Sequence, residues 1–91
     1  MMRKIKLTRA NKSILLKALA PYYYQQRVLG HSTQEVGKLI LKINALPADK
    51  KATFSTEEIY LMRTTVNQLR NERLPKGQYT DAADDMLLKL F

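Results

Sequence analysis

The clearest helix start in this 91-residue chain lies at Ser55. Ser55 and Glu58 have the spacing of a capping box, in which each side chain accepts a bond from the other residue's backbone N–H. Phe54 and Ile59 flank the box at the spacing of a hydrophobic staple. The apolar face that follows consists of Ile59, Met62, Val66 and Leu69. We therefore expect an amphipathic helix from Ser55 to the breaker segment 74–77.

A first helix is expected after Thr8, whose hydroxyl is suited to an N-cap. Its apolar positions recur at helical spacing: Ile14, Leu15, Ala18, Leu19 and Tyr22. Pro21 lies inside this pattern, where it removes a hydrogen bond and clashes with the carbonyl four residues earlier. We expect the helix to kink or restart there, and to stop near Gly30.

Two further helices complete the pattern. Ser32 and Glu35 form a second expected capping box, followed by an apolar stripe of Val36, Leu39, Ile40 and Ile43. Thr80 or Asp81 caps the last helix, whose apolar positions are Ala83, Met86, Leu87 and Leu90. Between the two halves, the segment 47–53 is expected to be a short polar linker.

A shift of 47 residues aligns segment 7–43 with segment 54–90 without a gap, and caps, stops and stripes coincide. Four aligned pairs are identical, so duplication and two unrelated hairpins of similar length both explain the match. Either way we expect one all-α domain over residues 1–91, a four-helix arrangement made of two helix-hairpin units. The alternating segment Arg3–Leu7 is a short edge strand or an extended arm.

Catalysis and metal binding find little support in the composition. The chain has no cysteine, a single histidine (His31) and three scattered glycines. Thiolate chemistry, cysteine zinc sites and phosphate-cradling glycine loops are thereby excluded. We expect a non-catalytic protein with no catalytic residues, no metal, no cofactor and no small-molecule substrate.

Charge is distributed unevenly along the chain. Residues 1–51 carry eleven cationic and two acidic side chains, whereas residues 52–91 carry five cationic and six acidic ones. A basic half beside a nearly neutral half is suited to a polyanionic partner. We expect a small regulatory protein, of the kind found among phage accessory inhibitors and modulators, that docks this basic face on an acidic protein. The expected contact residues are Arg3, Lys4, Lys6, Arg9, Lys12, Tyr23 and Arg27.

Direct nucleic-acid binding is the alternative. The segment 22–41 fits a helix-turn-helix template with Gly30 in the turn, which would direct Thr33, Gln34 and Lys38 toward base edges. The sequence leaves the oligomeric state open. No run approaches the roughly 20 apolar residues of a membrane span, so we expect no membrane partner and a cytoplasmic location.

Overall fold

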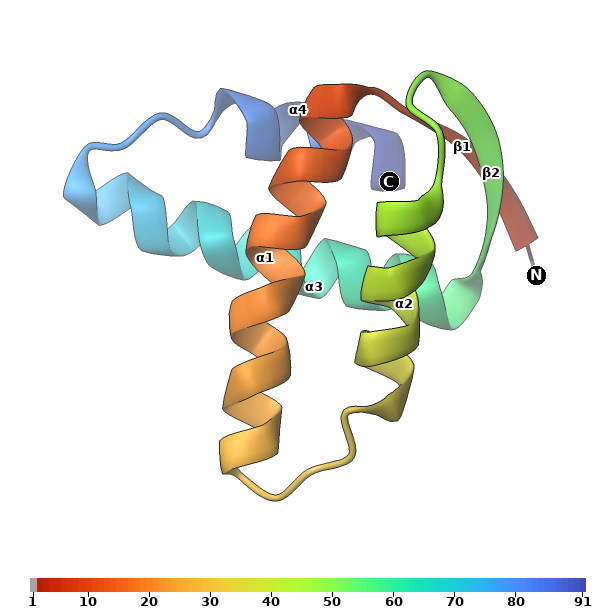
Figure 1. The fold of residues 1–91 in the computed structure, drawn as a ribbon. Coiled ribbons are helices and arrows are strands. Elements are labelled where there is room, and N and C mark those ends of the chain that lie inside the picture. Colours follow the sequence, from red (N-terminus) through yellow and green to blue (C-terminus); the bar gives the residue numbers. More distant parts are fainter. Residues whose placement is uncertain (1) are drawn as a thin grey trace.

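A computed structural model describes residues 2–91 of the chain (Figure 1). The elements in order are β1 (Met2–Leu7), α1 (Arg9–Val28), α2 (Gln34–Ala45), β2 (Lys50–Ser55), α3 (Thr56–Arg73), the 3₁₀ turn η1 (Leu74–Lys76) and α4 (Asp81–Leu90). The described part is mostly helical, with four α-helices and a two-stranded antiparallel sheet. The expectation of an all-α fold is therefore right for the helices and wrong for the sheet.

The two strands come from opposite halves of the sequence. Ile5 pairs with Ala52, Lys4 with Thr53 and Lys6 with Lys51. The alternating segment Arg3–Leu7 is thus part of a strand, which was one of the two expected alternatives, and not an extended arm. The expectation of a polar linker over 47–53 was wrong, because β2 begins at Lys50. A strand acquires its hydrogen bonds only from a partner, and this partner is distant in sequence.

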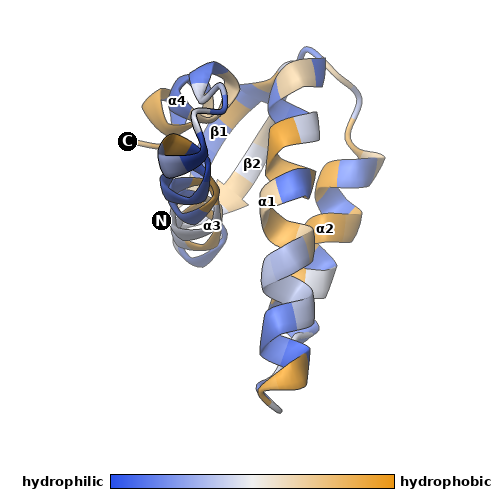
Figure 2. Ribbon diagram, turned by 90° about the vertical axis from the view of Figure 1, so that its left-hand side faces the viewer, coloured by the Kyte–Doolittle hydropathy of each residue, from blue (hydrophilic) through white to orange (hydrophobic). Residues whose placement is uncertain are grey.

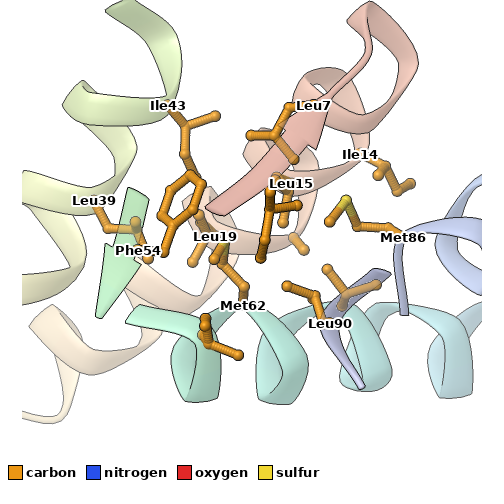
Figure 3. Packing of buried hydrophobic residues seen from close by; sticks show 14 of the residues in the cluster. Leu7, Ile14, Leu15, Leu19, Leu39, Ile43, Phe54, Met62, Met86 and Leu90 are labelled. Atoms are coloured by element: carbon orange, nitrogen blue, oxygen red, sulfur yellow. The ribbon is translucent and has the colours of Figure 1, made fainter. Parts of the chain in front are cut away.

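All six regular elements contribute to a single hydrophobic core (Figure 3). Each supplies at least one side chain that is almost completely buried: Leu7 from β1, Leu15 from α1, Ile43 from α2, Phe54 from β2, Met62 from α3 and Leu90 from α4. α1 contacts the other three helices, and α3 contacts α4. The stripes expected from helical spacing face this core.

The helix starts separate into two kinds. Thr8 and Ser55 are N-caps with complete capping boxes, formed with Asn11 and Glu58 respectively. The capping box expected at Ser32 and Glu35 was wrong. Helix α2 instead begins after Thr33, whose side chain makes no capping bond.

Helix α1 is helical throughout Arg9–Val28, so the expected alternative of a restart at Pro21 was wrong. Pro21 cannot donate to the carbonyl of Lys17, and both residues are on the exposed side of the helix. Solvent can therefore satisfy the carbonyl that loses its helical partner. Packing of the flanking residues Ala18 and Leu19 in the core holds the helix together across this position.

Positions 47 residues apart share their local conformation. Helices α1 and α3 begin 47 residues apart, as do α2 and α4. Gly30 and Gly77 both have positive φ, at 76° and 68°, in the turn that follows the first helix of each pair. Glycine tolerates this left-handed backbone without the steric penalty of a Cβ atom.

Candidate functional site

The two strands form a ribbon with one face against the core and one face in solvent. Leu7 and Phe54 are fully buried on the inner face and Ile5 is nearly so. Four side chains that alternate with the inner residues are exposed: Lys4, Lys6, Lys51 and Thr53. We call these four residues the outer face of the ribbon. Figure 2 shows the strands on the far side of the helices.

The ribbon is strongly basic. Its twelve residues, all of them described, include five cations and no carboxylate: Arg3, Lys4, Lys6, Lys50 and Lys51. Three of these cations, Lys4, Lys6 and Lys51, lie on the outer face, and cations gathered on one exposed surface produce a positive potential that attracts anions and raises their rate of association.

Two lysines from the helices hold the ribbon. Lys42 Nζ on α2 donates to the carbonyl of Thr53 at 2.7 Å, and Lys89 Nζ on α4 donates to the carbonyl of Lys6 at 3.0 Å. Lys89 also donates to Asn11 Oδ1. These bonds satisfy strand carbonyls at positions where the ribbon's side chains face solvent, and so they restrain the backbone that carries the outer face.

Lys42 additionally pairs with a carboxylate. Its ammonium lies 3.0 Å from Glu58 Oε1 and 3.1 Å from Oε2. Partial burial by itself would raise the pKa of Glu58, but the bonds from the Ser55 backbone N–H and from Lys42 outweigh it and lower that pKa. Glu58 is therefore ionised at neutral pH and serves as cap of α3 and counter-ion of Lys42 together.

Two of the expected contact residues are engaged within the fold. The guanidinium of Arg3 donates to the carbonyls of Lys89 at 2.8 Å and Leu90 at 3.0 Å, at the C-terminal end of α4. Lys12 Nζ donates to the carbonyl of Leu46, the C-cap of α2. Cations at helix C-termini satisfy orphan carbonyls and interact favourably with the helix dipole.

The other expected contact residues do not form one surface. Lys4 and Lys6 lie on the outer face of the ribbon, and Arg9 is exposed at the start of α1. Tyr23 and Arg27 follow Arg9 by 14 and 18 residues on the same helix, which corresponds to roughly 21 and 27 Å along its axis. The predicted basic face is therefore divided between the ribbon and the far end of α1.

The residues expected for helix-turn-helix recognition lie in a second place. Thr33, Gln34 and Lys38 line an open groove of about 530 Å³ between α1 and α2, together with Tyr23 and Leu41. Gln34 and Lys38 are exposed. This groove lies along the helical pair α1 and α2 that projects from the core in Figures 1 and 2, and no ribbon residue lines it.

Sequence reasoning missed two residues of the outer face, Lys51 and Thr53, because it assigned them to a linker. The available signal was the alternation of polar and less polar residues from Lys51 to Ser55, which matches a strand with one face buried. The capping box at Ser55 marks the start of the next helix, so the residues just before it were assigned to a linker and not to a strand.

No protein-family model, curated protein or solved structure matches this chain. Over residues 2–91, histidine and acidic side chains form no group of three or more that could hold a metal ion. None of the helices described is long and apolar enough to cross a bilayer.

Proposed function

We propose that this protein binds duplex DNA by placing its two-stranded ribbon in the major groove. The observation that carries the proposal is the outer face, where three lysines and a threonine project from an antiparallel ribbon that has no carboxylate. The major groove of B-DNA, about 12 Å wide, admits a two-stranded β-ribbon. Strands in a groove are an established means of reading base edges.

The side chains of the outer face suit the chemistry of that groove. Lysine ammonium groups can donate to O6 and N7 of guanine, and threonine can bond to base edges or contact the thymine methyl group. Arg9, exposed just after β1, and Lys50, exposed at the start of β2, are candidates for phosphate contacts, which position a protein without specifying sequence. The bonds from Lys42 and Lys89 would keep the ribbon in shape before it meets DNA.

We also propose that the fold consists of two β-α-α units, each made of a strand and a helix pair. The matching helix starts, the two left-handed glycines and the alignment of the core positions support this division. In this arrangement the ribbon is the place where the two units meet. A DNA-binding surface would then be built from equal lengths of both halves of the chain.

The test is the fluorescence anisotropy of a labelled duplex at about 50 and 200 mM salt. One variant replaces Lys4, Lys6 and Lys51 by glutamine. A matched control replaces three exposed lysines outside the ribbon, Lys17, Lys38 and Lys76, and loses the same charge. Wild type should bind tightly at low salt and more weakly at high salt.

We expect the ribbon variant to lose most of its affinity because the base contacts of its three lysines are removed, and to remain salt-dependent because the phosphate contacts of Arg9 and Lys50 are kept. The control should keep most of its affinity. Greater loss in the control would favour the α2 groove, which contains Lys38, over the ribbon. Absence of binding at low salt would overturn the proposal and would direct attention to docking of the same lysines on an acidic protein surface.

A further inference from the structure

The register of the ribbon has a twofold symmetry of its own. Ile5 pairs with Ala52, and these two positions are also related by the shift of 47 residues that relates the two halves of the chain. The same shift converts the pair Lys4–Thr53 into the pair Lys51–Lys6, which is also formed. Exchange of the two strands therefore leaves the pairing unchanged, with the axis passing between Ile5 and Ala52.

Contacts between helices and strands obey the same symmetry. Lys42 and Lys89 are 47 positions apart, and so are their strand acceptors, the carbonyls of Lys6 and Thr53. In each case the lysine reaches the strand of the other half of the chain. Their second acceptors, Asn11 and Glu58, are again equivalent positions. Two independent sets of contacts thus define one pseudo-twofold axis at the ribbon.

The outer face follows this axis at one position and departs from it at the other. Lys4 is equivalent to Lys51, and both are lysine. Lys6 is equivalent to Thr53, so an ammonium group on one side corresponds to a hydroxyl and a methyl group on the other. One end of the ribbon consequently presents Lys4 and Thr53, and the other end presents Lys6 and Lys51.

We infer, on the basis of the DNA binding proposed above, that the target duplex has two related but unequal halves. Each half contains a guanine read by the equivalent lysines, Lys4 and Lys51. The half that faces Lys6 contains a second guanine, because lysine donates to the O6 and N7 acceptors of that base. The half that faces Thr53 contains a base suited to a hydroxyl or methyl contact, such as thymine.

Two single substitutions at exposed positions would make the outer face symmetric. Thr53→Lys gives both ends two lysines, and Lys6→Thr gives both ends one lysine and one threonine. The bonds from Lys42 and Lys89 go to backbone carbonyls at these positions, so neither substitution removes an acceptor. Circular dichroism of each variant checks that the fold is retained.

The experiment selects the preferred duplexes of the wild type and of the two variants from a pool of random sequences. It then measures the affinity of each protein for each preferred duplex and for an unrelated one. The wild type should select unequal halves. Thr53→Lys should select a perfect palindrome of the guanine-rich half, and Lys6→Thr a perfect palindrome of the other half.

Each variant should prefer its own palindrome over the wild-type site by about tenfold, the factor expected for one base contact. Ratios within one protein remove the general effect of the added or lost charge. Equal halves in the wild-type site, variants that keep the wild-type preference, or tight binding without sequence preference would overturn this inference and leave DNA binding itself in place. Failure to bind any duplex would overturn both.

Discussion

Lys42 and Lys89 occupy equivalent positions in the two halves of the chain, and each crosses to a strand of the other half. Lys42 finds the carboxylate of Glu58 beside the strand carbonyl, whereas Lys89 finds the amide of Asn11. Glu58 and Asn11 are themselves equivalent, and each completes the capping box of its helix. In both halves, however, the lysine also donates to a backbone carbonyl of a strand.

The difference shows which part of this arrangement is required. An amide and a carboxylate both accept from an ammonium group and both cap a helix start, so either can occupy this position. The bond to the strand, by contrast, is present on both sides. We conclude that attachment of the ribbon to the helices is the shared task, and that the ion pair is an addition found in one half.

The largest effect should come from the equivalent core positions Leu7 and Phe54, both fully buried. Phe54→Ala should destabilise the fold by about 3–5 kcal/mol and Leu7→Ala by about 2–5 kcal/mol, through lost burial and the cavity left behind. Phe54 should be the costlier truncation because Lys42 Nζ also lies 4.6 Å from its ring centroid. Urea unfolding followed by circular dichroism measures both. A larger loss at Leu7 would contradict the ranking.

A moderate effect is expected when each lysine is replaced by methionine. Lys89→Met should cost about 2 kcal/mol, the net value of its two hydrogen bonds, and Lys42→Met somewhat more because it also leaves Glu58 without its counter-ion. Urea unfolding at pH 7 compares the two variants. Equal losses would show that the ion pair adds nothing to the strand bond.

The pH dependence sharpens this comparison. Because the pKa of Glu58 is lowered in the fold, its contribution is complete above the ordinary carboxyl pKa of about 4.3 and is lost as pH falls through the lower, folded value. The excess cost of Lys42→Met should therefore diminish on going from pH 7 to about pH 3. Glu58→Gln, which imitates the amide found at Asn11, should remove the excess at pH 7. If Lys42→Met still costs more than Lys89→Met at about pH 3, the additional cost comes from packing and not from the ion pair.

The smallest effect is expected at the equivalent pair Arg3 and Lys50. Arg3 caps the last carbonyls of α4, whereas the side chain of Lys50 has no hydrogen bond or ion pair among the residues described. Arg3→Ala should cost about 1 kcal/mol and Lys50→Ala less than about 0.5 kcal/mol. Thermal unfolding distinguishes them, with the Tm of the Arg3 variant lower by several degrees. Equal decreases in Tm for the two variants would show that the bonds from Arg3 to the end of α4 do not stabilise the fold.

The helices were predictable because their signals are local. The capping box at Ser55, the N-cap at Thr8 and the apolar stripes of the four helices can be recognised within a few residues of each other, and all are present in the structure. The false capping box at Ser32 shows the limit of such patterns. The N-cap is at Thr33, one residue later, and the chain starts α2 there without the side-chain bond.

The candidate site was only partly predictable. The basic N-terminal segment was identified, and Lys4 and Lys6 are exposed on the ribbon. Arg3 and Lys12 were included for their charge, but which cations bind helix ends and which face solvent depends on elements distant in the chain. Lys51 and Thr53 were missed because β2 forms its strand hydrogen bonds with β1, which is distant in the sequence.

The sequence by itself determined the helical segments, the positions of the left-handed glycines, the basic character of the first half and the 47-residue periodicity. The tertiary structure alone decided that the two halves meet as a ribbon, that its register is symmetric, and that each half is attached to the other by a lysine. The physical reason is the range of the interactions. Helix hydrogen bonds and caps close within four residues, whereas strand pairing and cross-chain bonds join residues more than forty positions apart for Ile5 and Ala52 and more than eighty for Lys6 and Lys89.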